Sequence, residues 1–220
     1  MVNFLSQQLL NLFLKPNCPL CDRTAEEILC RYCKQQLLDS KIAQPDRYWQ
    51  AELPLFAWGK YEGSVKRSIG KLKYDGCRSI ADLYGEWLGA SWAASSLANA
   101  YPKLMIVPIP LHSDKLATRG FNQAELIARS FCQTTRHKLD LSLQRNRSTV
   151  AQFGLSKLAR QENVSGAFSI DPKSSLKPGV TVLLIDDIYT TGATVRAAAD
   201  VLRKRQINVC GVAVVATGKD

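Results

Sequence analysis

Apolar residues in this chain gather in two kinds of run, short continuous stretches and longer stretches with helical spacing. The continuous stretches have the length of buried strands and cover residues 56–61, 104–109, 180–185 and 207–216. Helical spacing is found in residues 64–73, 80–97, 122–132 and 195–205. Because strands and helices alternate along the chain, the pattern predicts an α/β fold with a doubly wound parallel sheet.

The segment after the strand predicted over residues 180–185 carries the most informative chemistry. Two carboxylates, Asp186 and Asp187, end the apolar run, and a turn with three hydroxyl side chains and Gly192 follows. Ligands of open α/β sheets bind at such strand ends, glycine lets the backbone approach a ligand closely, and the free amides of a helix start favour an anion. The segment therefore predicts a site for a phosphate beside carboxylates that accept hydrogen bonds from a diol. A sugar phosphate has both groups.

An ordinary strand, turn and helix with a solvated acidic cap is the alternative interpretation of this segment. Adjacent carboxylates repel each other, and a purely structural turn has little use for both Asp186 and Asp187. We therefore favour a ligand site.

Two C-x-x-C pairs separated by eight residues contain four of the seven cysteines, namely Cys18, Cys21, Cys30 and Cys33. Two such pairs can surround one ion with four thiolates, which suits structural zinc because no position is left for water. Disulfides, a redox C-x-x-C and an iron–sulfur cluster are the alternatives. No export signal is recognised and a reducing compartment disfavours disulfides, so the spacing predicts a zinc site.

The N-terminal residues 1–14 are apolar with helical spacing, but they lack a basic leading region and contain Gln7, Gln8 and Asn11. A signal peptide is therefore not expected, and a packed amphipathic helix is favoured over one that lies on a membrane surface. The chain also lacks an apolar run long enough to span a membrane. We expect a cytoplasmic protein with an N-terminal helix and zinc-binding unit in residues 1–45 and a second domain in residues 46–220.

The formal net charge of +10 is unevenly distributed. Residues 101–150 contain eight Lys and Arg against three Asp and Glu, an excess of five. A second basic cluster consists of Lys66, Arg67, Lys71, Lys73 and Arg78. A basic surface fits a polyanionic partner, either a pyrophosphate-bearing substrate or nucleic acid. A solvated basic face is the alternative, and no helix-turn-helix or aromatic RNA-binding motif is recognised.

The order of residues from Val182 to Thr194, four apolar residues followed by Asp-Asp-x-x-x-Thr-Gly-x-Thr, is similar to a known signature. It resembles the motif with which type I phosphoribosyltransferases bind 5-phosphoribosyl 1-pyrophosphate (PRPP). The resemblance implies that the acidic pair holds the ribose 2′- and 3′-hydroxyls and that the turn wraps the 5′-phosphate. The residues assigned to PRPP in this way are Asp186, Asp187, Tyr189, Thr190, Thr191, Gly192, Ala193 and Thr194.

Other segments extend the resemblance to the ComF/GntX family over nearly the whole chain. In chain order they are the cysteine pairs, Lys71-x-Lys73-Tyr74, the Arg-Gly-Phe-Asn-Gln segment at residues 119–123, and Gln152, Arg160 and Asn163. That family is associated with competence for DNA uptake, and its relatives with the use of DNA as a nutrient. The resemblance implies PRPP as a ligand and suggests single-stranded DNA and other DNA-uptake proteins as partners.

In type I transferases, pyrophosphate leaves the anomeric carbon of PRPP while a nitrogen nucleophile arrives. Charge builds on the leaving oxygens, so the resemblance implies Mg²⁺ bound with PRPP and cationic donors nearby. Lys115 and Arg119 are the candidate pyrophosphate contacts, because they lie in the loop expected after the strand at residues 104–109. Weaker candidates are Lys73, Arg147 and Arg160, and His112 is interpreted as a loop residue without a role.

The turn departs from the oxopurine branch of the type I enzymes. That branch has an Asp directly before the Thr-Gly of the turn, and this chain has Thr190 there. No acid replaces it in the turn and no base-covering hood is recognisable, so a hypoxanthine or guanine transferase of that kind is not expected. The alternative to a transferase is a non-catalytic protein that senses PRPP and handles single-stranded DNA. A purely structural partner protein is disfavoured by the acidic pair.

Overall fold

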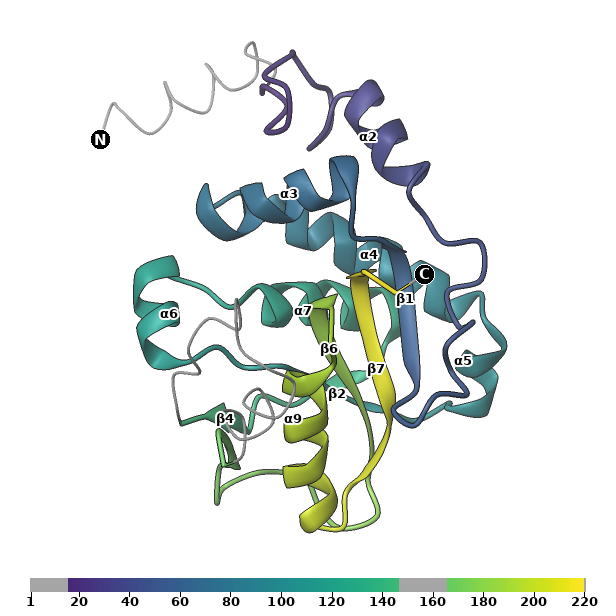
Figure 1. The fold of residues 1–220 in the computed structure, drawn as a ribbon, viewed down its shortest axis with the longest axis vertical. Helices are drawn as coiled ribbons and strands as arrows, with labels where there is room; N and C mark the ends of the chain where they lie inside the picture. Colours follow the sequence, from purple (N-terminus) through teal and green to yellow (C-terminus); the bar gives the residue numbers. More distant parts are fainter. Residues whose placement is uncertain (1–15, 147–165, 220) are drawn as a thin grey trace, which may run out of the picture.

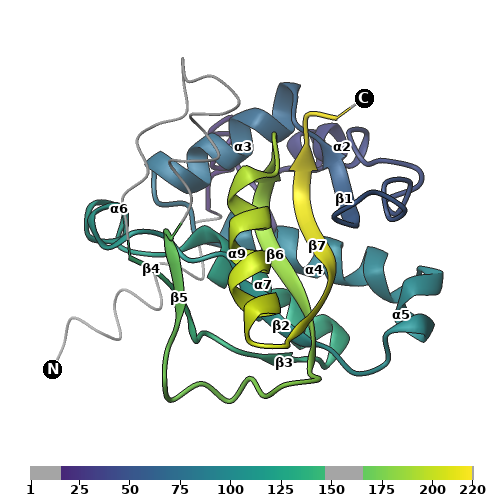
Figure 2. The same cartoon turned by 60° about the horizontal axis from the view of Figure 1, so that its bottom comes forward.

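A computed structural model describes residues 16–146 and 166–219 of the protein. Five parallel strands form its central sheet in the order β1-β7-β6-β2-β3. A separate antiparallel pair, β4 and β5, lies beside the sheet (Figures 1 and 2). The strands are β1 (Leu55–Lys60), β2 (Met105–Pro108), β3 (Lys138–Leu139), β4 (Leu143–Arg145), β5 (Phe168–Ile170), β6 (Thr181–Tyr189) and β7 (Asn208–Thr217). The helices are α2 (Arg31–Leu38), α3 (Gly63–Tyr74), α4 (Ser79–Ala93), α5 (Ser96–Ala100), α6 (Ser113–Arg119), α7 (Gln123–Thr135) and α9 (Ala193–Lys204).

Helices cover both faces of the sheet, as Figures 1 and 2 show. Leu183 and Ile185 of β6 belong to the apolar core under α3, α4 and α7. Val182 and Leu184 belong to a second core under α9. Successive side chains of a strand point to opposite faces, so a nearly continuous apolar run such as residues 182–185 fits a strand covered on both sides. The prediction of a doubly wound α/β fold is confirmed.

The end of β6 differs from its prediction in a way that matters for the site. The sequence pattern placed a loop directly after Ile185, but β6 continues to Tyr189 because β7 offers partners along this length. Asp186 pairs with Val214 and Tyr189 with Thr217. Asp186 and Asp187 therefore lie in a strand, where neighbouring backbone fixes their positions. The carboxyl ends of β6 and β7 point toward α3 (Figure 1).

Two other segments also differ from the sequence prediction. The single helix expected over residues 80–97 is interrupted, because α4 ends at Ala93 and the short α5 begins at Ser96. The loop expected after β2 contains α6, a seven-residue helix that ends at Gly120 in the left-handed conformation. The helix predicted over residues 1–14 lies outside the described residues, as do Arg147, Gln152, Arg160 and Asn163.

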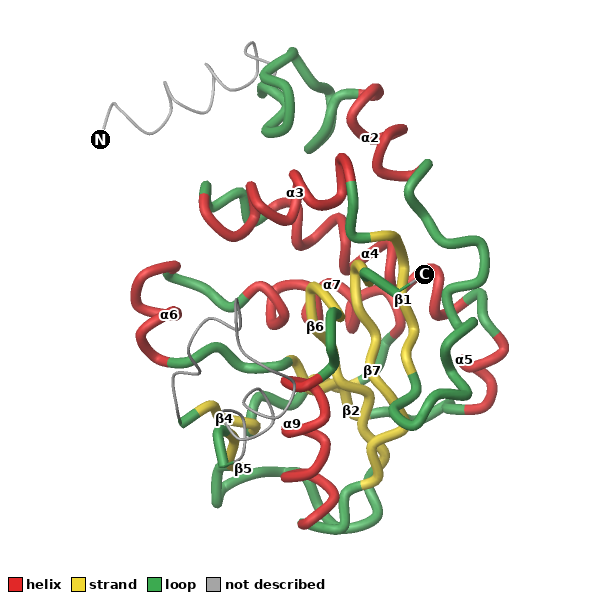
Figure 3. The backbone as a smooth tube through the Cα atoms, in the orientation of Figure 1, coloured by secondary structure: helices red, strands yellow, loops and turns green. Residues whose placement is uncertain are grey.

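The N-terminal part joins the sheet through hydrogen bonds to β1 and α3. Ile42 donates its backbone N–H to the carbonyl of Trp58 at 2.9 Å, and the Ser64 hydroxyl donates to the carbonyl of Gln36 at 3.0 Å. Between residues 16 and 45, α2 is the one helix in a segment that is otherwise mostly loop (Figure 3). The domain boundary at residue 45 stays a prediction. In the part of the chain that the structure describes, no helix is long and apolar enough to cross a membrane.

Candidate functional site

The acidic pair lies at the carboxyl end of β6 and is held by two polar contacts. Asp187 is buried, with 8% of its surface exposed. Its Oδ2 lies 2.6 Å from Nζ of Lys73, which comes from the last turn of α3. The backbone N–H of Asp187 donates to Oδ1 of Asp186 at 2.8 Å. Lys73, a weaker candidate from the sequence, is thus in direct contact with the residues predicted to bind the sugar.

Burial and neighbouring charges shift the pKa values of Asp186 and Lys73. Burial and the neighbouring charge of Asp187 raise the pKa of Asp186 to about 8. Burial alone would lower the pKa of Lys73, but the charge and hydrogen bond of Asp187 outweigh it, and the pKa lies above that of an ordinary lysine. The site therefore keeps a positive lysine against the acidic pair, and Asp186 is poised to take up or release a proton near neutral pH.

The turn after β6 has the backbone shape that its glycine predicts. Gly192 has φ of 75°, in the left-handed region, and immediately precedes α9. A Cβ at this position would collide with the Tyr189 hydroxyl. Gly192 offers no side chain to cap α9, so the backbone amides at the helix start face the turn. Residues 188–195 with Asp186 enclose a small hollow of about 30 Å³ here, and these features suit a bound anion.

A larger pocket of about 260 Å³ lies between the acidic pair and three cationic side chains. Lys115 and Arg119 enter it from α6, and Arg145 enters it from the end of β4. Burial lowers the pKa of Lys115, and the nearby charges of Arg145 and Arg119 lower it further. These cations are close enough to act on one another, and an anionic ligand between them would relieve their repulsion.

Hydrogen bonds hold the wall of this pocket in place. The Arg119 guanidinium donates through Nη1 to Oε1 of the buried Gln123 at 2.7 Å. Asn122 caps α7 by accepting from the backbone N–H of Ala124, and its Nδ2 donates to the carbonyl of Ile109 at 3.0 Å. These contacts tie the start of α7 to the segment after β2, which explains the role of Asn122 and Gln123 in the sequence motif.

The structure changes three details of the predicted site. Lys115 and Arg119 lie on α6 and not in a loop. His112 caps that helix, since its Nδ1 accepts from the backbone N–H of Asp114 at 3.3 Å. Arg145 was not a candidate from the sequence, because nothing in a short polar run indicates that its strand ends at the pocket. Arg147 and Arg160 lie outside the described residues.

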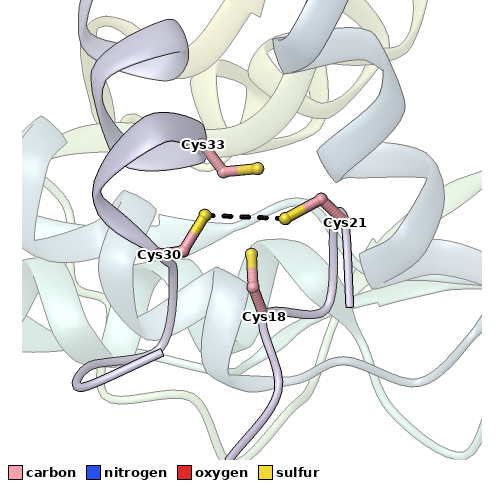
Figure 4. Close-up of side chains that lie close together, drawn as sticks. All are labelled: Cys18, Cys21, Cys30 and Cys33. Atoms are coloured by element: carbon pink, nitrogen blue, oxygen red, sulfur yellow. Dashed lines mark hydrogen bonds between the residues drawn. The ribbon is translucent and has the colours of Figure 1, made fainter. Parts of the chain in front are cut away.

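The four cysteines of the two C-x-x-C pairs converge in the N-terminal part (Figure 4). Their sulfur atoms all lie within 4.8 Å of one another, and Sγ of Cys21 is 3.5 Å from Sγ of Cys30. Four thiolates around one zinc at about 2.3 Å would lie roughly 3.8 Å apart, so the cluster has the size of a metal site. A backbone hydrogen bond from Cys33 lowers the pKa of Cys30 to about 7, and burial raises that of Cys33.

Comparison with known protein families gives one match that covers more than half of the chain. The model of the phosphoribosyl transferase domain matches residues 93–220. This range contains β2, α6, β6, the acidic pair and the turn before α9. Lys73 and the cysteine cluster precede it.

Among curated proteins, the chain is similar to competence protein ComFC of Bacillus subtilis. The two are 28% identical over 194 residues, which is 86% of this chain and 72% of that protein. It is also similar to competence protein F of Haemophilus influenzae, with 34% identity over 112 residues. That second match covers 49% of this chain and 49% of the relative.

Similarity to solved structures is weaker. An adenine phosphoribosyltransferase from Leishmania donovani shares 16% sequence identity and gives a TM-score of 0.41. The match covers 84% of this chain and 67% of that chain.

Proposed function

The chain belongs to the phosphoribosyl transferase domain family, and from this premise we propose that the pocket at the end of β6 binds PRPP. One observation supports the proposal most strongly. The same pocket is lined by Asp186 and Asp187 from β6 and by Lys115, Arg119 and Arg145 from α6 and β4. PRPP carries a diol, a 5′-phosphate and a pyrophosphate, and the pocket with the adjoining turn offers chemistry for all three.

Each part of the ligand has a counterpart among the residues. The acidic pair would accept hydrogen bonds from the ribose 2′- and 3′-hydroxyls. The 5′-phosphate would lie in the turn formed by Thr190, Thr191, Gly192, Ala193 and Thr194, facing the start of α9, in the hollow that Tyr189 also lines. Lys115 and Arg119 would contact the pyrophosphate, and Arg145 joins them from β4. Mg²⁺ bound with PRPP would neutralise further charge on the pyrophosphate oxygens.

If the protein is catalytic, the reaction is a displacement at the anomeric carbon of PRPP. The bond from C1′ to the pyrophosphate oxygen breaks with its electron pair, and a nitrogen of the acceptor forms a new bond to C1′. Cations placed at the leaving oxygens stabilise the charge that develops there. The turn has Thr190 where the oxopurine branch has an acid, so no base for such an acceptor is supplied from this turn.

We propose that the cysteine cluster holds one structural zinc ion. Four sulfurs at these separations leave no open position for water, which suits a structural role better than a catalytic one. An iron–sulfur cluster is the alternative for the same ligand set. Zinc-bound thiolates suit a reducing compartment, and we accordingly propose a cytoplasmic protein with a metal-binding unit in residues 1–45 and a transferase-like domain in residues 46–220.

For the biological role we propose participation in DNA uptake or in the use of DNA as a nutrient. The support comes from the competence proteins to which the chain is similar. Single-stranded DNA and other DNA-uptake proteins are the proposed partners, in line with the net charge of +10.

One experiment distinguishes a phosphoribosyl transferase from a non-catalytic PRPP-sensing protein. The protein is incubated with radiolabelled PRPP, Mg²⁺ and a panel of nitrogenous bases, and pyrophosphate release is measured. Release that depends on one base identifies a transferase and its acceptor. PRPP binding without release under any condition supports the second candidate, a PRPP-sensing protein that handles single-stranded DNA. The Thr at position 190 is the observation that favours this second candidate.

A further inference from the structure

The second C-x-x-C pair presents two side chains, Arg31 and Tyr32, between two of the clustered cysteines. Both stand at the start of α2, and Tyr32 is 55% exposed although Cys30 and Cys33 on either side of the two are buried. The sulfur atoms of the cluster lie close together, so the backbone that carries the ring is held in place. A side chain on a fixed backbone has less freedom to lose when a ligand binds. The cysteine unit therefore offers an aromatic surface that metal binding alone does not explain.

Two arginines flank this exposed ring. The guanidinium of Arg31 lies 5.0 Å from the centre of the Tyr32 ring, and that of Arg23 lies 5.4 Å from it. Among the described residues, neither guanidinium has a hydrogen-bond or ion-pair partner. An arginine can keep its plane on an aromatic ring while the N–H groups at its edge bind a phosphate. The ring is thus accompanied by cationic donors that are not used within the described fold.

A cavity of about 560 Å³ opens beside these three side chains. Lys34 and Glu27 also line it, and they neutralise each other in an ion pair at 2.6 Å. Glu26 is the remaining acidic residue of the lining, against the two arginines. A cavity of this size has room for a nucleotide. A nucleotide has a flat base that stacks on a ring and a phosphate that pairs with a guanidinium, so its chemistry matches this surface.

We propose that this face of the cysteine unit binds single-stranded nucleic acid, with one base stacked on Tyr32 and neighbouring phosphates bound by Arg23 and Arg31. A single strand is favoured over a duplex because its bases expose the faces that stack on a ring. It is favoured over an acidic protein segment because a ring between two cations matches a base between two phosphates. The net charge of +10 attracts such a polyanion.

The inference rests on the single-stranded partner proposed above and assigns a surface to it. This surface shares no lining residue with the pocket at the end of β6. The two proposals can therefore be tested independently of each other.

The first part of the test removes the ring. Binding of fluorescein-labelled single-stranded oligodeoxyadenylate to the full chain, as purified with its metal, is measured by anisotropy at several salt concentrations and without PRPP. Tyr32→Leu keeps an apolar side chain but loses the ring, so it should bind at least about fivefold more weakly with an unchanged salt dependence. Tyr32→Phe keeps the ring and should bind within about twofold of the wild type.

The second part removes the charges. Arg23→Gln and Arg31→Gln should each reduce the steepness of log K against log salt by about 0.7, the contribution of one phosphate contact on a single strand. Arg203→Gln is the matched control, because Arg203 is exposed in the last turn of α9 and loses the same charge. It should leave the slope of the wild type unchanged. Equal metal content in all variants verifies that the cysteine cluster is intact.

The inference is overturned if the wild type does not bind the strand, if Tyr32→Leu binds it as tightly as the wild type, or if the slopes of Arg23→Gln and Arg31→Gln equal that of Arg203→Gln. Two competitors test the identity of the partner. Deoxyadenosine monophosphate that binds as tightly as the strand would assign the surface to a free nucleotide, and displacement by polyglutamate at equal charge would assign it to an acidic protein segment. Either result contradicts the inference. PRPP binding is measured separately, and its absence would contradict the proposed pocket without producing any of these results.

Discussion

Replacing Lys73 by Met should destabilise the fold by roughly 2–4 kcal/mol, because Asp187 would keep a buried charge without its partner. The two side chains meet at 2.6 Å and are only 20% and 11% exposed. Two unit charges about 4 Å apart attract by roughly 4 kcal/mol at an effective dielectric constant near 20. Desolvation of both groups offsets much of this attraction. The net stabilisation by the pair is therefore smaller than the destabilisation caused by removing one partner.

A double-mutant cycle separates these quantities. Lys73→Met, Asp187→Asn and the double variant are unfolded in urea, and the free energies of unfolding give a coupling energy that we expect to be about 1–3 kcal/mol. The chain supplies a matched control at the end of the same helix. Lys71 and Asp75 also meet at 2.6 Å, but they are 38% and 48% exposed, so solvent screens their attraction and their coupling should be clearly smaller. Equal coupling in the two cycles would refute the argument that burial makes the Lys73–Asp187 contact strong.

Three further outcomes follow from the structure. Protein purified without chelators should contain about one zinc per chain by elemental analysis, and removal of the metal should lower the unfolding temperature. A preparation free of metal would contradict the zinc site. Iron with a visible charge-transfer band would indicate an iron–sulfur cluster instead. The pKa of Asp186 is raised to about 8 from an ordinary value of about 4. At pH values between these two, the folded chain keeps a proton that the unfolded chain releases. Stability should therefore fall as pH rises through this window, and urea unfolding of Asp186→Asn should lack this component; identical pH profiles for the variant and the wild type would argue against it. Gly192→Ala should lower the free energy of unfolding in urea by more than about 1 kcal/mol, because the new Cβ collides with the Tyr189 hydroxyl and also strains the backbone. Gly179→Ala is the control. Gly179 has φ of 84° but open space around it, so this variant measures the backbone strain alone. Equal losses in the two glycine variants would show that the collision is unimportant.

The sequence predicted the parts of the fold that depend on local pattern. Continuous apolar runs at residues 104–109 and 180–185 became β2 and β6, central strands whose both faces are covered. The cysteine spacing predicted a cluster that the structure brings together. These features depend only on periodicity, on the length of a run and on the geometry of a short turn. All three can be read from the sequence alone.

The sequence could not predict features that depend on a distant partner. The length of β6 beyond Ile185 is set by pairing with β7, as at Asp186 with Val214. Likewise, the contact of Lys73 with Asp187 joins residues more than a hundred positions apart. Arg145 reaches the pocket only because β4 pairs with β5 beside the sheet. Side chains brought together by tertiary contacts leave no periodic pattern in the sequence. For this reason Lys115 and Arg119 were predicted at the pocket and Arg145 was not.

The most direct test of the account is calorimetric titration of PRPP, with Mg²⁺ present, into the wild type and Asp187→Ala. Asp200→Ala serves as the control, because Asp200 is an exposed carboxylate on α9. We expect the wild type and Asp200→Ala to bind PRPP alike, and Asp187→Ala to bind more weakly by at least roughly 1–3 kcal/mol, the loss expected for hydrogen bonds to a charged group. Folding of each variant is checked by its urea midpoint. Equal PRPP affinity in the wild type and Asp187→Ala, or no PRPP binding by the wild type, would contradict the claim that the acidic pair of β6 holds the ribose.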